Sequence, residues 1–264
     1  MKTKKSQLCA KLLSLCTVAL ILTGCGSTPN HFIDAAATNQ ITSTQAFVTV
    51  PQKEITAEVE ASQVAAAGGG GLLLALIDVA VESNRAKTAE ELVQPIKDSL
   101  VDIDFNELFV AELNKNLKSV DWLNVENVQL NADLTQNLRE ENFAMADSDA
   151  VLFVNAGYSL SSNFSSLKGY ASVSLLPKTE ELKLFSEKPS TKNAKKSEWH
   201  IDNNLYRDRV MTSVNLLTTT DKENNAAQLK DEPEKIRSEI KKLAAELAIQ
   251  IASSIRNTRS AEKA

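Results

Sequence analysis

Ala150-Val151-Leu152-Phe153-Val154-Asn155-Ala156 is the stretch that decides the fold of this chain. All of its residues except Asn155 are apolar, and they do not alternate with polar residues, so a strand built from them is apolar on both faces. Such a strand is stable where other elements cover both of its faces. We therefore predict a central strand over 150–156, with the rest of the domain arranged around it.

The sequence after this stretch predicts further strands. Tyr170–Leu176 alternates apolar and polar residues, which is typical of a strand with one buried face. Pro177–Glu180 predicts a turn toward a third candidate strand, Leu182–Phe185, and Leu205–Val214 is a fourth. Glu187–Glu198 is highly charged and is expected to form an exposed loop. Several strands in succession favour antiparallel pairing in this half of the chain.

The strongest helical signal comes near the C-terminus. Pro233 suits the first turn of a helix, where its missing N–H costs no hydrogen bond, and the acidic residues beside it suit the positive end of the helix dipole. Apolar residues then recur at helical spacing for about 20 residues. They are Ile236, Ile240, Leu243, Leu247, Ile251 and Ile255, with Arg256 and Arg259 near the negative end. We predict a long amphipathic helix that packs on the sheet.

The chain before the central strand predicts both strands and helices. Ala46–Val50 and Glu54–Val59 alternate apolar and polar residues, as strands do. The other elements expected here are a helix started or reinforced at Thr88–Glu91 and kinked by Pro95, a helix from Asp104 with Leu113 and Leu117 on its apolar face, a strand over Leu123–Leu130 and a helix over Asp133–Ala146. The order of elements predicts an α+β fold with a mixed, mostly antiparallel sheet and packed helices.

The N-terminal residues have the parts of a secretory signal. Residues 1–11 contain four lysines and no acidic residue. Leu12–Leu22 is an apolar run that is too short for a transmembrane helix of about 20 apolar residues. The stretch Leu22-Thr23-Gly24-Cys25 follows, and it resembles the lipobox of bacterial lipoproteins. An ordinary secretory signal with a chance cysteine and a retained signal anchor are the alternatives.

The lipobox resemblance implies how the protein is held. It implies cleavage between Gly24 and Cys25, a diacylglyceryl group on the Cys25 thiol and an acyl chain such as palmitate on the new amine. Stable anchoring needs more than one lipid chain, which a triacylated cysteine supplies. Because Gly26 and Ser27 follow the cysteine, with no Asp next to it, the resemblance implies the outer membrane, with the protein on its periplasmic face. No cofactor is expected beyond this covalent lipid.

Cleavage also changes the composition. The formal charge goes from −5 to −9, because four lysines and no acidic residue are removed. An acidic protein is a poor partner for nucleic acid, whose binding depends on Lys and Arg. Cys9 and Cys16 leave with the signal and Cys25 carries lipid, so no thiol remains for catalysis, redox chemistry, disulfides or metal binding.

The predicted parts of the chain follow from these signals. They are a signal peptide (1–24), a lipidated cysteine with a polar tether (25–44), a strand-like segment with a Gly-rich apolar helix (45–85), an α+β globular domain (86–257) and a loose tail (258–264). The order of elements in 86–257 is similar to that of compact α/β domains in outer-membrane lipoproteins, such as the curli-secretion type and the activators of penicillin-binding proteins. No functional residue carries over from this similarity.

Val64–Val81 is the other unusual stretch, with four consecutive glycines before an apolar run. One interpretation is a glycine hinge followed by a buried helix over Leu72–Asn84. Another is a membrane-inserting or self-associating segment, in which small residues allow close packing. A phosphate-binding loop is a third, although no Lys-Ser or Lys-Thr follows the glycines.

We find no set of residues that carries a reaction or binds a metal. His31 lies in the predicted tether and His200 beside a lysine-rich loop, without the partners of a catalytic triad. Two pairs of carboxylates, Asp102 with Asp104 and Asp147 with Asp149, suit helix caps and turns, or a hydrolase that uses carboxylates alone. Lys192, Lys195 and Lys196 with Trp199 form a basic patch that suits a solvated loop or an anionic partner such as lipid headgroups.

These observations favour a non-enzymatic, membrane-anchored lipoprotein that serves as an adaptor or accessory subunit of a cell-envelope assembly, with an envelope protein as its partner. The alternative is an oligomeric pore or secretion-channel subunit that uses residues 64–84. A carboxylate-dependent envelope hydrolase is the third hypothesis.

Overall fold

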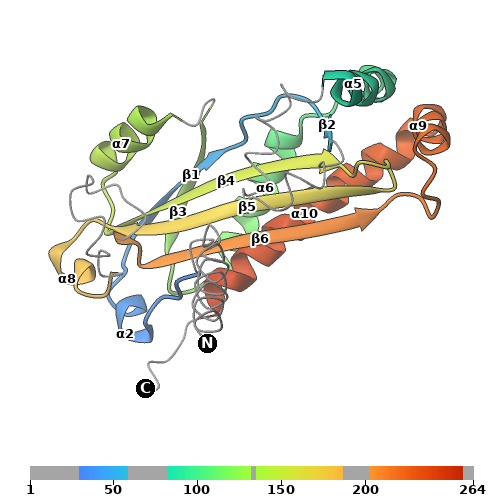
Figure 1. Cartoon of the computed structure of the whole chain (residues 1–264). Helices are drawn as coiled ribbons and strands as arrows, with labels where there is room; N and C mark the ends of the chain where they lie inside the picture. Colours follow the sequence, from blue (N-terminus) through green and yellow to red (C-terminus); the bar gives the residue numbers. More distant parts are fainter. Residues whose placement is uncertain (1–29, 59–82, 132–134, 187–202, 258–264) are drawn as a thin grey trace, which may run out of the picture. The chain divides into compact units, whose positions relative to one another are not determined.

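Strand β4 (Ala150–Leu160) lies in the middle of a six-stranded sheet (Figure 1). The structure is a computed structural model that describes residues 30–58, 83–131, 135–186 and 203–257. β4 pairs in parallel with β1 (Thr44–Thr49) and the short β2 (Thr56–Ala57) on one side, and antiparallel with β5 (Ser166–Pro177) on the other. Every residue of β4 except Asn155 is buried, which confirms the prediction of a central strand.

The sheet is mixed. β3 (Val125–Asn131) pairs in parallel with β1 at one edge, and β6 (Tyr206–Asn215) pairs antiparallel with β5 at the other, in the order β3-β1-β4-β5-β6. The two longest pairings, β4 with β5 and β5 with β6, are antiparallel. The predicted α+β fold with a mixed sheet is therefore confirmed.

Helices α10 (Pro233–Arg256) and α6 (Phe105–Leu117) pack side by side on one face of the sheet (Figure 1). α10 covers β5 and β6, and α6 lies against β3. The whole predicted stripe of α10, from Ile236 to Ile255, is buried, and so are Phe105, Phe109, Leu113 and Leu117 of α6. Helix α5 (Ser83–Asp98), which continues through Pro95, adds Val93 and Ile96 to the same core.

The opposite face of the sheet, which we call the outer face, carries α7 (Gln136–Met145). The chain moves outward from β1 to β3 and then back past β1 to β4. Crossovers of the same hand that run in opposite directions put their helices on opposite faces, so α7 lies away from α6. A small second cluster forms there, from Phe47, Phe143, Ala146, Val151, Phe153 and Leu176.

One glycine sets the close approach of α10 to the sheet. A Cβ atom on Gly169 of β5 would lie 3.3 Å from both Cγ and Cδ1 of Leu243 in α10. That is shorter than ordinary van der Waals contact, so a side chain here would push the helix away. Gly169 therefore lets the longest helix pack tightly on β5.

One predicted strand is a helix in the structure, and one helix was not predicted. Leu182–Phe185, predicted as a strand, is not one, because helix α8 (Glu180–Lys183) occupies this position. Thr179 caps α8 by accepting a hydrogen bond from the Leu182 N–H, and two acidic residues stand in its first turn, so local capping outweighs the alternating pattern. Helix α9 (Lys222–Asp231), capped by Asp221, was not predicted.

The predicted tether also differs from the structure over 30–44. Helix α2 (Ala35–Thr38) lies in this segment, and Ile33, Ala37 and Ile41 are buried in the main core. Apolar residues among polar ones thus hold the segment on the domain instead of leaving it extended. The strand that follows, β1, belongs to the middle of the same sheet. This sheet therefore contains strands from both sides of the predicted boundary between 45–85 and the globular domain, so the described parts of the two segments form one domain.

Other predicted segments lie outside the described residues. They are the signal and lipobox, most of the Gly-rich stretch 64–84, the loop 187–198 and the tail 258–264. Among the helices of the described residues, none is both long and apolar enough to cross a membrane.

Candidate functional site

Three of the four carboxylates that the sequence singled out lie in separate surroundings. Asp104 accepts hydrogen bonds from the first free N–H groups of α6 and caps this helix. Asp102 pairs with Arg237 of α10, whose hydrogen bond holds the pKa of the Asp102 carboxyl below its usual value. Asp147 is exposed in the turn after α7. The fold therefore separates the first pair, Asp102 and Asp104, into two different contacts.

The fourth carboxylate, Asp149, joins β4 to the segment before β1. Its Oδ2 atom accepts hydrogen bonds from the Thr42 N–H (2.8 Å), the Thr42 hydroxyl (2.6 Å) and the Ser43 N–H (3.2 Å). The hydroxyl contact is the main cause of a lowered pKa of Asp149. Hydrolysis by two carboxylates requires a pair of them across a cleft, and none of the four lines either of the cavities described below.

The other predicted site residues are divided between the sheet edge and the undescribed segments. His31 exchanges two backbone hydrogen bonds of 2.8 Å with Arg207 of β6, so it extends the sheet locally. Gly24, Cys25, Lys192, Lys195, Lys196, Trp199 and His200 lie outside the described residues. Within the described part of the chain, no group of His, Cys, Asp and Glu is placed to hold a metal ion.

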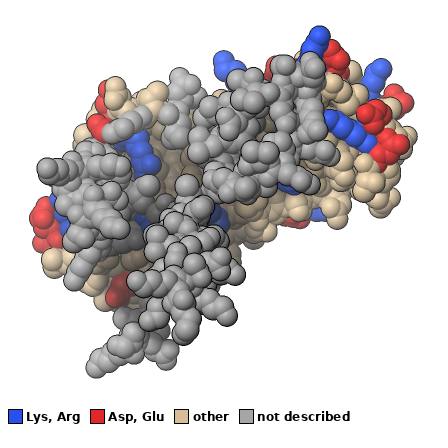
Figure 2. Space-filling model, in the orientation of Figure 1, with Lys and Arg blue, Asp and Glu red and all other residues tan. Residues whose placement is uncertain are grey.

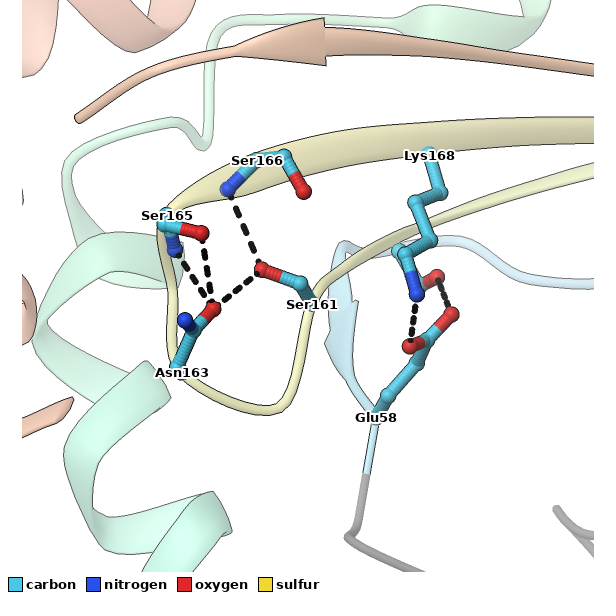
Figure 3. Close-up of polar contacts among 7 residues, drawn as sticks. Glu58, Ser161, Asn163, Ser165, Ser166 and Lys168 are labelled. Atoms are coloured by element: carbon cyan, nitrogen blue, oxygen red, sulfur yellow. Dashed lines mark hydrogen bonds and ion pairs between the residues drawn. The ribbon is translucent and has the colours of Figure 1, made fainter. Parts of the chain in front are cut away.

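A polar cluster closes the hairpin between β4 and β5 (Figure 3). Asn163 Oδ1 accepts hydrogen bonds from the hydroxyls of Ser161 and Ser165, both 2.8 Å, and from the Ser165 N–H. The Ser161 hydroxyl in turn accepts the N–H of Ser166, the first residue of β5. These bonds satisfy the polar groups of a turn that holds Phe164 at a φ of 59°.

Next to this turn, Glu58 lies against the two strands (Figure 3). It pairs with Lys168 of β5 at 2.6 Å and accepts a hydrogen bond from the Ser159 hydroxyl of β4 at 3.3 Å. Ser159 and Lys168 are direct cross-strand neighbours. Both groups donate to the same carboxylate, and the Lys168 ammonium balances the charge of Glu58. These contacts hold the chain in place where it leaves β2.

One cavity is bordered by the loop before β2, by α5 and by α10, and has a volume of about 210 Å³. Lys97 at its wall pairs with Glu90 at 2.6 Å and with Glu54 at 3.7 Å, so its charge is already balanced. Burial raises the pKa of Tyr158, another wall residue. On the face shown in Figure 2, Lys and Arg side chains are likewise interspersed with acidic ones at the end that carries α5 and α9. This end of the domain offers balanced charges.

The second cavity lies on the outer face beside α7 and has a volume of about 100 Å³. Side chains from α7 and three strands surround it: Phe47 and Thr49 of β1, Arg139 of α7, Phe153 and Asn155 of β4, and Ser172 and Ser174 of β5. Its wall therefore combines one cation, hydroxyl and amide groups, and two aromatic rings. The rings of Phe47 and Phe153 stack with their centroids 5.6 Å apart. We take this cavity, the Arg139 cavity, as the candidate site.

Arg139 is the distinctive group of this cavity. Its Nη2 donates to the Ser174 hydroxyl at 2.8 Å, and its guanidinium carbon lies 4.6 Å from the ring centroid of Phe153. Its Nε is buried and has no hydrogen-bond partner. No carboxylate among the described residues forms an ion pair with it, and burial lowers its pKa. The fold thus holds a guanidinium whose charge the described residues leave unbalanced.

The sequence did not single out Arg139, because a lone arginine in a predicted helix suggests a solvated residue. Two signals were available. Ser172 and Ser174 are the polar positions of a half-buried strand, and that strand lies beside a central strand whose two faces are both apolar. Something other than water must therefore cover the outer face near them. Which helix does so depends on the crossover from β3 to β4, which local sequence does not specify.

Another cluster of polar side chains lies on the helix face of β6. The Tyr206 hydroxyl donates to the Ser254 hydroxyl of α10 at 2.7 Å, and Ser254 donates to Asp208. Burial raises the pKa of Tyr206. These three side chains fasten the end of α10 to the edge strand, and neither cavity includes them.

Comparison of the chain with protein-family models, with curated proteins and with solved structures gave no match.

Proposed function

We propose that this chain is a bacterial lipoprotein, anchored by lipid on Cys25 at the periplasmic face of the outer membrane, and that its α+β domain is a non-enzymatic adaptor or accessory subunit of a cell-envelope assembly. The observation that carries the proposal is Leu22-Thr23-Gly24-Cys25, which follows a basic start and a short apolar run. Two or three lipid chains on one residue suffice for stable membrane binding.

The position of the folded domain supports an adaptor that works close to the membrane. Ile33 is fully buried in the core and lies only eight positions after Cys25. A chain spans at most about 3.6 Å per residue, so the domain would begin within about 30 Å of the lipid. Confinement to this layer raises the effective concentration of the domain toward a partner on the same membrane.

Sizing of the native particle tests the adaptor role. The protein is extracted from membranes in mild detergent, its particle mass is measured by light scattering and co-purifying chains are identified. We expect a small particle that contains this chain and a different envelope protein. The Cys25→Ser variant, which lacks the lipid, should recover much less of that partner because its domain is not anchored by lipid beside the partner.

Two other results would contradict the adaptor role. A bare monomer would leave the domain without a partner. A large homo-oligomer that dissociates when Leu73→Asp is introduced would instead favour a pore or secretion-channel subunit built on residues 64–84. Ser213→Asp is the matched control for that variant, because it adds the same charge on an exposed position of β6.

A further inference from the structure

We propose that the Arg139 cavity binds a carboxylate group, with Arg139 as its cation and the polar side chains of β1, β4 and β5 as its neutral partners. This inference does not depend on the lipid anchor or on the adaptor role, and it can fail separately from them.

The first argument is the unbalanced charge. Two other cations with mostly covered side chains have carboxylate partners: Lys97 pairs with Glu90 and Glu54, and Arg237 pairs with Asp102. Arg139 has only the Ser174 hydroxyl and the face of Phe153. A guanidinium removed from water without an anion is costly, whereas the same group is favourable once an anion pairs with it.

The second argument is the chemistry of the walls. Hydroxyl groups of Thr49, Ser172 and Ser174 and the amide of Asn155 surround the same space as the guanidinium. Such groups can donate hydrogen bonds to the oxygens of an anion. The rings of Phe47 and Phe153 supply an apolar wall that suits the carbon bearing a carboxylate. A volume of about 100 Å³ holds one such group rather than a large ligand.

The third argument concerns the charge of the ligand. Arg139 is the one cation among the side chains that line the cavity, so a monoanion balances it, whereas a phosphate dianion would leave one negative charge unpaired. The planar carboxylate also matches the guanidinium geometry. Outside the lining, the exposed Arg209 of β6 is the cross-strand neighbour of Ser172 and adds positive potential at the rim. The site thus favours a carboxylate, carried either by a small acid or by the C-terminus of a peptide.

The test follows the Arg139 Nε–H signal by nuclear magnetic resonance in the ¹⁵N-labelled full chain extracted from membranes. Acetate is the probe, and sodium chloride at equal ionic strength is the control. The signal is assigned by its loss in Arg139→Lys. We expect acetate to shift it with saturation in the millimolar range, while the signal of Arg237, which Asp102 already pairs, stays in place.

Two variants make the test specific. Ser172→Asp places a carboxylate at the exposed mouth of the cavity and should weaken acetate binding about tenfold or more, by competition and by repulsion. Ser213→Asp adds the same charge on an exposed position of β6 and should leave acetate binding unchanged. In Arg139→Gln, acetate should no longer shift the backbone signals of Asn155 and Ser172, while the dispersion of the whole spectrum shows that the chain is folded.

The source of the carboxylate is distinguished by a second titration. A tripeptide with a free C-terminal carboxylate that binds more tightly than acetate, and its amidated form that does not bind, would support the site and indicate a peptide ligand. Acetate and the tripeptide binding equally would support the site and indicate a small acid. Two results would overturn the proposal: saturable binding of inorganic phosphate without binding of acetate, or equal shifts in acetate and sodium chloride.

Discussion

Single polar side chains join segments of this domain that are far apart in the sequence. Asp149 connects the start of β4 to Thr42 and Ser43, more than a hundred residues earlier. Glu58 binds Lys168 and Ser159 at the other end of the same strands. The two contacts hold both ends of the parallel pairing beside β4, which supports the central position of that strand.

We predict that Asp149→Ala lowers the free energy of unfolding by about 1–2 kcal/mol at neutral pH, because the Thr42 and Ser43 groups lose their charged acceptor. The native pKa of Asp149 is lowered, so the unfolded carboxyl takes up a proton first as the pH falls below about 4. The stabilisation is therefore present above that pH and is lost as the pH falls through the native pKa. Urea unfolding at pH 7 and pH 3 measures the difference between variant and wild type.

Asp147→Ala is the matched control for this prediction, since Asp147 is exposed in the same turn. It should leave the free energy of unfolding at pH 7 nearly unchanged. A difference between Asp149→Ala and wild type that is the same at both pH values would show that the charge of Asp149 does not contribute.

The roles of single residues could be predicted only in part from the sequence. Asp104 was expected at a helix start and is found there, since a cap depends on a few neighbouring residues. The role of Arg139 could not be predicted in the same way. Its position beside Ser174 and Phe153 depends on which face of the sheet α7 covers, and that is a property of the topology.

Whole elements were predicted where the pattern was long. The apolar stripe of α10 spans many turns, and the apolar run of β4 leaves no polar face, so each pattern indicates one structure. Short segments were less certain. Leu182–Phe185 has too few residues for its period to be decisive, and the Thr179 cap makes it helical, while α9 has little apolar periodicity to detect.

The packing of α10 gives a prediction at this scale. Gly169→Val is expected to lower the free energy of unfolding by about 1–3 kcal/mol, because its side chain meets Leu243 and α10 must move outward. Urea unfolding measures this change. Ser213→Val, on the exposed side of β6, is the control and should change stability much less. Equal stability of Gly169→Val and wild type would contradict the close approach of helix and sheet.

For the whole molecule, the main correction concerns the segment after the lipobox. The sequence suggested a tether as far as residue 44, yet the described chain is packed from Ile33 onward. Small and polar residues dominate this segment, so its few apolar side chains gave a weak signal that only the tertiary core makes clear. Because the connection to Cys25 is short, the proposed anchor would keep the domain close to the membrane.

The intact mass of the mature protein, isolated from membranes, tests the central claim most directly. We predict a polypeptide that begins at Cys25 and is heavier than residues 25–264 by one diacylglyceryl and one acyl group, and the same product from Cys16→Ser, in which the lipobox is intact. The Cys25→Ser variant should lack the lipid mass. An unmodified mature chain, or a wild-type protein that retains residues 1–24, would contradict the account.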